Sequence, residues 1–290
     1  MLFRSAEKHD RQHQTDHADA EDDVEIAVMG VRHDPAIAVQ EILDAENPAY
    51  LGTIETGAAE IAKLARAAGA ETIVGVDPLS LGVMMAPGDY GADIVTGPVQ
   101  PLGVHMNCGG GVGGFIASRD EERYVHEYNG FLVSIAPTAE PGQLGFGLAS
   151  SHQNSYGSRE HGKDWTGNST YLWAIAGAVY MSLLGPEGFR EVGDLILSRA
   201  RYAARLIGDV PGVKIVWPET TFKEFVVNFD GTGKTVEAVN EALRAGGIFG
   251  GKDISKEGYG LGEAALYCVT EIHTAADIRR LADALKEVCQ

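Results

Sequence analysis

In the first half of the chain, apolar residues follow two different periods. Residues 57–68 carry an apolar stripe with helical spacing, which predicts an amphipathic helix. The stripe consists of Ala58, Ile61, Leu64 and Ala65. Residues 72–76 form a β-branched run typical of a buried strand, and shorter strands are predicted over 92–96 and 115–117. A helix followed directly by a buried strand indicates an α/β fold with a parallel-type sheet and helical crossovers.

The pattern before this helix is weaker. Residues 24–29 alternate as a strand does, residues 35–45 have helical spacing, and Asn47-Pro48 marks a turn. Residues 1–22 are polar and charged, so we expect them to form a disordered, acidic tail that contains histidines. The first folded domain is therefore predicted to begin near residue 23.

Between residues 119 and 170 the periodicity becomes less regular. A helical turn is predicted over 119–124, and short strands are predicted over 130–135 and 146–149. The stretch that follows is rich in hydrogen-bonding side chains and has no apolar period. We expect it to be a polar loop that ends near residue 170.

The C-terminal part is predicted to contain two long helices and a small α+β domain. The helices span 169–184 and 187–206 and are separated by the helix-breaking pair Gly185-Pro186. Short strands and helices then alternate, so we expect a partial large domain over 23–208 and a small domain over 209–290. The small domain is expected to have strands over 213–216, 224–229 and 265–270 and helices over 235–244 and 275–288.

The amino-acid composition excludes some classes of binding partner. The 290 residues include 41 acidic and 23 basic side chains, which give a formal net charge of -18. This charge argues against nucleic acid or an anionic membrane as the main partner. No apolar run approaches the roughly 20 residues of a membrane helix, and the first ten residues lack a signal-like core, so a cytoplasmic location is expected. The three cysteines lack metal-ligand spacing, which predicts no structural zinc.

Asp77 is the clearest candidate for chemistry, because it ends the buried strand at 72–76 and precedes a proline. Open α/β sheets bind ligands at the carboxyl ends of their strands. A metal ligand, a general base and an acid that pairs with a pyridinium nitrogen all remain open for Asp77, as does a purely structural role as a helix-capping or turn-forming residue. Gly109, Gly111 and Gly114 match G-x-G-x-x-G, but a strand follows them, which disfavours a dinucleotide site.

The polar loop offers a second candidate site. Lys163 lies near Arg159, His161 and Thr166 in sequence, a set that suits an anion or a phosphate group. Ordinary solvated loop charges explain the same pattern. The histidines His105 and His152 lack the spacing and the G-x-S-x-G turn that would indicate a hydrolase. The spacing of residues alone therefore predicts only an α/β protein with a polar site.

Several consecutive motifs match one family. The chain carries DPLSLG from Asp77, PGDYGADI from Pro87 and GPVQPLG from Gly97, followed by a glycine-rich turn. In this order they resemble the α chain, or subunit 1, of two-subunit glycine dehydrogenase (decarboxylating), the P-protein of the glycine cleavage system. The resemblance covers about residues 48–290 and includes Lys163, Thr166, LGPEG from Leu184 and VTE from Val269.

The resemblance implies a fold-type-I fold of pyridoxal 5'-phosphate (PLP) enzymes. Asp77 matches the acid that contacts the pyridine nitrogen, and Gln100 stands where catalytic chains carry the Schiff-base lysine. Glutamine cannot form an imine, so the resemblance implies that a partner chain holds PLP covalently and that this chain has no catalytic residue of its own. By the same resemblance Lys163, Thr166 and Asn168 are expected to contact the cofactor. Substrate or interface roles are expected for His105, His152, Arg159 and His161.

The implied function is that of a glycine decarboxylase subunit that is inactive alone. The expected partners are a lysine-bearing β-type subunit, a further chain that supplies the missing N-terminal part of the large domain, and the lipoyl carrier protein. The charged loop before Lys163 and the TSNICT run of the family are both altered here, to GSREHGKDWTGNST, with Trp165 and Gly167 as differences. Two alternatives therefore stay open, namely a split PLP-dependent decarboxylase or lyase for another amine or amino acid, and a non-catalytic scaffold or regulatory protein. An autonomous enzyme that uses Lys163 or Lys252 is the least favoured hypothesis.

Overall fold

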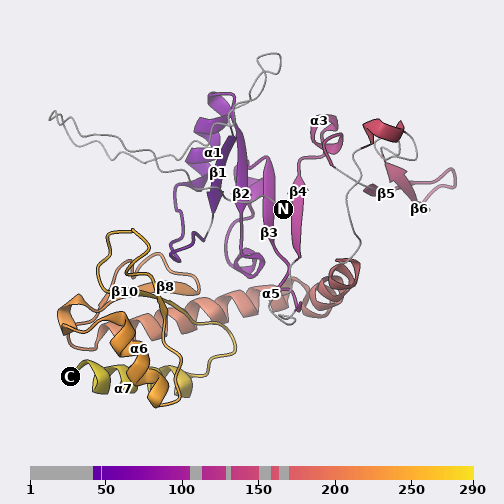
Figure 1. Ribbon diagram of the computed structural model, residues 1–290. Helices are drawn as coiled ribbons and strands as arrows, with labels where there is room; N and C mark the ends of the chain where they lie inside the picture. Colours follow the sequence, from indigo (N-terminus) through magenta and orange to yellow (C-terminus); the bar gives the residue numbers. More distant parts are fainter. Residues whose placement is uncertain (1–41, 47, 105–112, 129–131, 150–157, 163–169) are drawn as a thin grey trace, which may run out of the picture.

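The protein is described by a computed structural model that contains two four-stranded sheets, a separate hairpin and a long helix that runs beside both sheets (Figure 1). The model describes residues 42–46, 48–104, 113–128, 132–149, 158–162 and 170–290. The predicted strand at 24–29 and the predicted tail lie outside these ranges. The domain limits at residues 23 and 208 stay predictions.

The first sheet, called the N-terminal sheet below, has the strand order β1-β2-β3-β4. Its strands are β1 (Ile42–Glu46), β2 (Glu71–Gly75), β3 (Ile94–Pro98) and β4 (Gly114–Ser118). The first three are parallel, as predicted, whereas β4 pairs antiparallel with β3. β2 and β3 therefore end at the same edge of the sheet, where the strand-end acid was expected.

The helix predicted over 35–45 is wrong in its last part, because residues 42–46 form β1. This strand pairs along its whole length with β2, from Ile42 opposite Glu71 to Glu46 opposite Gly75. Backbone pairing with a neighbouring strand overrides a weak local helical spacing. The amphipathic helix predicted over 57–68 is confirmed as α1 (Ala58–Ala67).

Short helices connect the strands of the N-terminal sheet. The 3₁₀ helix η1 (Pro78–Gly82) follows β2, α2 (Pro87–Tyr90) precedes β3, and α3 (Glu122–Val125) follows β4. Proline starts both η1 and α2, where its missing N–H group costs no hydrogen bond. The helical turn expected over 119–124 is confirmed, although it begins three residues later.

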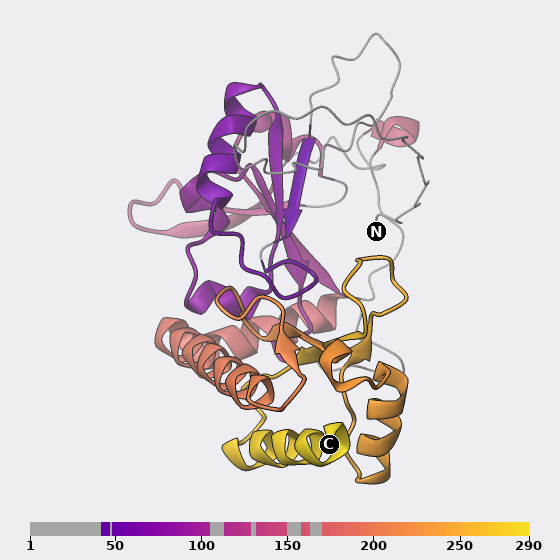
Figure 2. The same cartoon turned by 90° about the vertical axis from the view of Figure 1, so that its left-hand side faces the viewer.

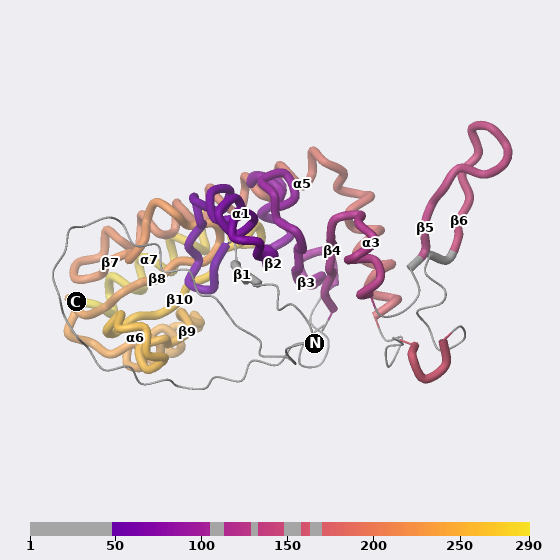
Figure 3. Tube along the Cα trace, turned by 90° about the horizontal axis from the view of Figure 1, so that it is seen from above, coloured from indigo at the N-terminus to yellow at the C-terminus, as the bar shows by residue number. Residues whose placement is uncertain are grey.

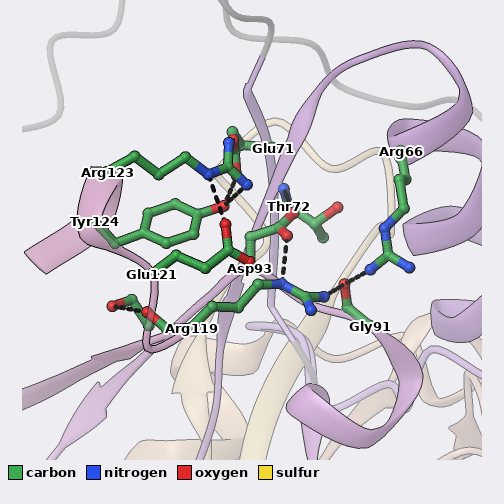
Figure 4. A network of polar contacts seen from close by, with 10 residues as sticks. Arg66, Glu71, Thr72, Gly91, Asp93, Arg119, Glu121, Arg123 and Tyr124 are labelled. Carbon is green, nitrogen blue, oxygen red and sulfur yellow. Dashed lines mark hydrogen bonds and ion pairs between the residues drawn. The ribbon is translucent and has the colours of Figure 1, made fainter.

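A polar cluster fixes the amino ends of β2 and β3, away from the edge that carries the strand-end acid (Figure 4). Oδ2 of Asp93, on a side chain only 9% exposed, accepts a 2.9 Å hydrogen bond from the backbone N–H of Thr72, and Oδ1 accepts one of 2.8 Å from Nε of Arg119. Arg119 and Arg66 both donate to the carbonyl oxygen of Gly91. A buried carboxylate with several donors stabilises the strand ends that it joins.

Glu71 extends the same cluster. Its carboxylate accepts hydrogen bonds from Arg123, at 2.5 Å, and from the Tyr124 hydroxyl. Burial, together with the hydrogen bond to Glu71, raises the pKa of Tyr124 far above its usual range. Tyr124 therefore stays protonated and holds α3 against the start of β2.

A hairpin extends away from the rest of the molecule. It consists of β5 (Leu132–Pro137) and β6 (Leu144–Ala149), which pair only with each other among the described strands (Figure 3). Both strands were predicted. The short 3₁₀ helix η3 (Arg159–His161) follows in the segment expected to be a polar loop.

The helix α5 (Tyr171–Gly208) contains both long helices that the sequence predicts. They meet at Gly185, whose φ of 61° and ψ of −179° are accessible to glycine but not to residues with a side chain. The part after Gly185 contributes Ala200, Ala203 and Ile207 to the main apolar core.

The second sheet, called the C-terminal sheet below, has the order β7-β8-β10-β9 and is antiparallel. Its strands are β7 (Lys214–Ile215), β8 (Glu224–Asn228), β9 (Lys252–Asp253) and β10 (Ala264–Cys268). The helices α6 (Val236–Ala245) and α7 (Ala275–Cys289) pack with α5 on one face (Figure 2). The sequence missed β9, because two residues are too short to show a period. A 3₁₀ turn, η4 (Asp230–Thr232), follows β8.

Candidate functional site

The two sheets meet where the segment before α1 lies beside the segment before β8. Thr53 and Thr221 form an isolated antiparallel bridge, and the backbone N–H of Ile54 donates a 2.7 Å hydrogen bond to the carbonyl of Thr220. Gly52 approaches Glu224 so closely that a Cβ atom on Gly52 would lie 2.0 Å from the Glu224 carbonyl oxygen. This close contact places β8 against the carboxyl ends of β2 and β3.

A cavity of about 310 Å³ lies at this junction. It is lined by the ends of β2 and β3, by the loop at residues 48–52 and by Lys223 and Glu224. Asp77 follows β2 and faces the same cavity. The strand ends at which a ligand site was predicted therefore line this cavity, and ligand binding there stays a prediction.

Asp77 uses both carboxylate oxygens within the chain. Oδ1 accepts a 3.0 Å hydrogen bond from the backbone N–H of Leu79, which caps η1. Oδ2 forms an ion pair with Nζ of Lys223. The Asp77 side chain is 9% exposed. The capping role that was left open from the sequence is thus present, together with an ion pair that was not predicted.

Lys223 reaches Asp77 from the residue just before β8. Its neighbours Phe222 and Phe225 are almost fully buried, and its carbonyl oxygen accepts a 2.8 Å hydrogen bond from the backbone N–H of Val269. Burial by itself lowers the pKa of Lys223, but the charge and hydrogen bond of Asp77 outweigh this effect, so the net pKa is raised. The amine therefore stays protonated. The one sequence signal for Lys223 is the charged pair Lys223-Glu224 between the buried aromatic residues of TFKEF.

Two further ionisable groups adjoin the pair. Burial and the Asp77 charge raise the pKa of Glu224, although Lys223 lowers it in part. Burial, and then the Glu224 charge, raise the pKa of the Cys268 thiol to about 11, although the residue as a whole is exposed. The junction thus combines two carboxylates, one ammonium group and one thiol.

Comparisons with known proteins decide the family. The family model of the glycine cleavage system P-protein matches residues 13–285. The chain belongs to the P-protein family. Two curated relatives are both named probable glycine dehydrogenase (decarboxylating) subunit 1. The protein from Staphylothermus marinus is 34% identical over 84% of this chain and 52% of its own length, and that from Desulfitobacterium hafniense is 35% identical over 84% and 53%.

Solved structures agree with this assignment. A crystal structure of glycine decarboxylase (P-protein) in inhibitor-bound form matches with a TM-score of 0.74 and 37% identity, over 85% of this chain and 55% of that one. A NifS-like protein from Rickettsia africae shares only the fold, at a TM-score of 0.58 and 15% identity. The fold-type-I prediction is therefore confirmed. The P-protein-like chain spans about half the length of the relatives that it matches.

The structure brings together few of the other predicted site residues. Gln100 is exposed in the turn after β3 and does not line the cavity. Arg159 and His161 are exposed in η3. Five predicted residues lie outside the described ranges, namely His105, His152, Lys163, Thr166 and Asn168. The roles proposed for all of these residues stay predictions.

The cavity of this P-protein-like chain does not suit PLP. The cofactor requires an acid at its ring nitrogen and a lysine amine that is free to react. Both oxygens of Asp77 are already engaged, and among the described lining residues the one lysine is Lys223, whose protonated amine is held by Asp77. We therefore derive no chemical step in this cavity.

Two features are absent from the described residues. Within these ranges no group of three or more histidine, cysteine or acidic side chains is arranged to hold a metal ion. The same ranges contain no helix that is both long and apolar enough to cross a membrane.

Proposed function

We propose that this chain is the α-type, catalytically incomplete subunit of a PLP-dependent glycine decarboxylase. One observation carries the proposal. In a member of the P-protein family, the strand-end acid Asp77 is paired with Lys223 instead of being open to a cofactor. The reaction then needs a site on another polypeptide, which is the lysine-bearing β-type subunit. The name subunit 1 of the curated relatives supports this division of the enzyme.

The hairpin supports the need for a partner. Val133, Ile135, Leu144 and Phe146 project from one face of β5 and β6 and are 63–80% exposed. A two-stranded hairpin with an uncovered apolar face is marginally stable in water. We propose that the β-type subunit covers this face.

The first part of α5 supports the same conclusion. Residues 171–184 contain no charged side chain, although 22% of the whole chain is charged. Leu172, Ile175, Val179 and Leu183 are spaced by three, four and four residues and are each more than half exposed. This spacing forms one continuous stripe along the helix, as expected for a surface that packs against another helix. We propose that this stripe belongs to the same interface.

When bound to the partner, PLP would accept the electron pair that is left when glycine loses carbon dioxide. This chain would complete the partner's pocket. Lys163, Thr166 and Asn168 would bind the cofactor's phosphate group, while His105, His152, Arg159 and His161 would contact the substrate or the interface. The lipoyl carrier protein would receive the aminomethyl group. A cytoplasmic location also belongs to the proposal.

Reconstitution tests the proposed function. This chain is co-expressed with a candidate lysine-bearing subunit, and release of carbon dioxide from carboxyl-labelled glycine is measured with lipoyl carrier protein present. We expect turnover only with both chains. Lys163→Ala should reduce turnover by about tenfold to hundredfold, as for loss of a charged phosphate contact. The control is Lys63→Ala in α1, because the Lys63 side chain is 75% exposed.

The other outcomes separate the alternatives. Turnover of a different amino acid or amine, but not of glycine, would identify a divergent decarboxylase or lyase. Full activity of the Lys163→Ala variant in a stable complex would support the hypothesis that this chain is a non-catalytic scaffold or regulatory protein. Glycine turnover by this chain alone would contradict the split-subunit proposal.

A further inference from the structure

The ion pair between Asp77 and Lys223 spans the two sheets. Asp77 follows β2 of the N-terminal sheet, and Lys223 precedes β8 of the C-terminal sheet. The side chains are 9% and 27% exposed, so the contact is largely removed from water. The strand-end acid is therefore occupied by a cation that belongs to the chain itself.

Lys223 is held in place by its backbone on both sides. Two residues before it, Thr221 bridges to Thr53, and the carbonyl of Lys223 itself accepts a hydrogen bond from the backbone N–H of Val269. Phe222 and Phe225 anchor the segment in the apolar interior. The backbone of Lys223 is thus fixed at a position from which its ammonium group reaches Asp77.

We propose that Lys223 is an internal substitute for the cofactor's pyridinium ring, so that its ammonium group on Asp77 closes this chain's own cavity to PLP and ties β8 to the end of β2. A protonated ring nitrogen and a lysine ammonium need the same partner, a carboxylate oxygen that accepts a charge-assisted hydrogen bond. A ring that displaced Lys223 would leave a buried ammonium group without its carboxylate, which is strongly unfavourable.

The charges around the ion pair also disfavour binding of PLP in this cavity. Asp77 and Glu224 carry two negative charges against the single positive charge of Lys223, and all three line the cavity. An additional phosphate group would meet net negative charge there. The inference uses the family's cofactor chemistry but does not depend on the proposed glycine decarboxylase activity.

The first test measures non-covalent binding of pyridoxamine 5'-phosphate, which has the pyridine ring but cannot form an imine with lysine. Fluorescence titrations compare the full chain, Lys223→Ala, Asp77→Asn/Lys223→Ala and the exposed-site control Lys63→Ala. We expect Lys223→Ala to bind the probe about tenfold or more tightly than wild type, because Asp77 is then open to the ring nitrogen. The double variant and the control should bind as weakly as wild type.

The second test does not require Lys223→Ala to fold. The full chain is treated with PLP and then with borohydride, which fixes the aldehyde on free lysine amines, and each lysine is quantified by mass spectrometry. In the wild type Lys63 should be labelled and Lys223 should be protected. Asp77→Asn should increase the labelling of Lys223 several-fold, because its amine loses the carboxylate that keeps it protonated.

Two results would overturn the inference. One is binding of pyridoxamine 5'-phosphate to the wild type as tight as to Lys223→Ala. The other is labelling of Lys223 in the wild type to the same extent as Lys63. Neither readout requires glycine turnover, so failure of this inference and failure of the proposed function can be told apart.

Discussion

At the residue scale, the candidate site depends on pairs of side chains that are distant in sequence. Asp77 could be placed from sequence, because an apolar strand that ends on an acid before proline is a local pattern. Lys223 could not, because its contact with Asp77 forms only when the two sheets meet. The same limit applies to Arg123 and Glu71, which are joined only after α3 folds back on β2. Local periodicity contains no information on such contacts.

Glu224 provides a prediction about pH. Its pKa is raised in the folded protein, mainly by burial, so folding favours the protonated carboxyl group. The corresponding contribution to stability is complete below the unfolded pKa, near 4.5, and is lost as pH rises through the raised folded value. Glu224→Gln has no such loss, so at pH 7 we expect its thermal midpoint to exceed that of the wild type, by on the order of 2 °C.

The measurement is a series of thermal melts from pH 4 to pH 8. The difference between Glu224→Gln and wild type should grow with pH and vanish at the acidic end. Glu60→Gln, an exposed position on α1, controls for the loss of one negative charge. A larger gain at pH 4 than at pH 8 would show that the sign of the effect is wrong.

At the scale of elements, regular periodicity was a reliable guide. The helices α1, α6 and α7 lie where the apolar stripes indicate, and the break within α5 falls at the predicted Gly185. β1 and β9 were missed, because the first has ambiguous spacing and the second is too short. The sequence also did not predict the contact between η1 and α5, because a close approach of two backbones that are distant in sequence leaves no local pattern.

Gly82 tests that contact. A Cβ atom at this position would lie 2.2 Å from the carbonyl oxygen of Phe189 in α5, so Gly82→Ala must push η1 away from the helix. Overpacking of this kind costs about 1–3 kcal/mol in the free energy of unfolding. Gly88→Ala in α2 is the matched control, because a Cβ atom there meets no other atom within 4 Å.

Urea unfolding curves of the two variants supply the measurement. We expect a lower midpoint for Gly82→Ala and little change for Gly88→Ala. Because η1 follows Asp77 directly, Gly82→Ala should also increase PLP labelling of Lys223. Equal midpoints for both variants would show that α5 is not as close to η1 as described.

At the scale of the whole molecule, the main feature is exposed apolar surface on the hairpin and on the first part of α5. The exposed faces of the hairpin and of α5 could not be derived from the sequence, because an apolar stripe indicates burial without saying which polypeptide provides the cover. The resemblance of the motifs, rather than the pattern of apolar residues, supplied the expectation of a partner. The fold shows which side chains are left uncovered.

Ile135→Asp tests the hairpin as an interface. The Ile135 side chain is 63% exposed, so the change should leave the fold of the isolated chain intact while weakening its complex with the β-type subunit by at least tenfold. Ser134→Asp introduces the same charge on the opposite face of the hairpin and should have little effect. Co-purification and analytical ultracentrifugation give the readout, and equal behaviour of the two variants would assign the interface elsewhere.

The distribution of charge also affects how readily the unassembled chain aggregates in solution. Only one charged residue lies within residues 132–149, and none lies within 171–184, so nearly all of the net charge of -18 is carried by other parts of the chain. Mutual repulsion between copies opposes sticking of the bare apolar patches, and dissolved salt screens that repulsion over about 10 Å at 0.1 M. The unassembled chain is therefore best protected from aggregation at low ionic strength. Salt should be added only after the complex with the partner has formed.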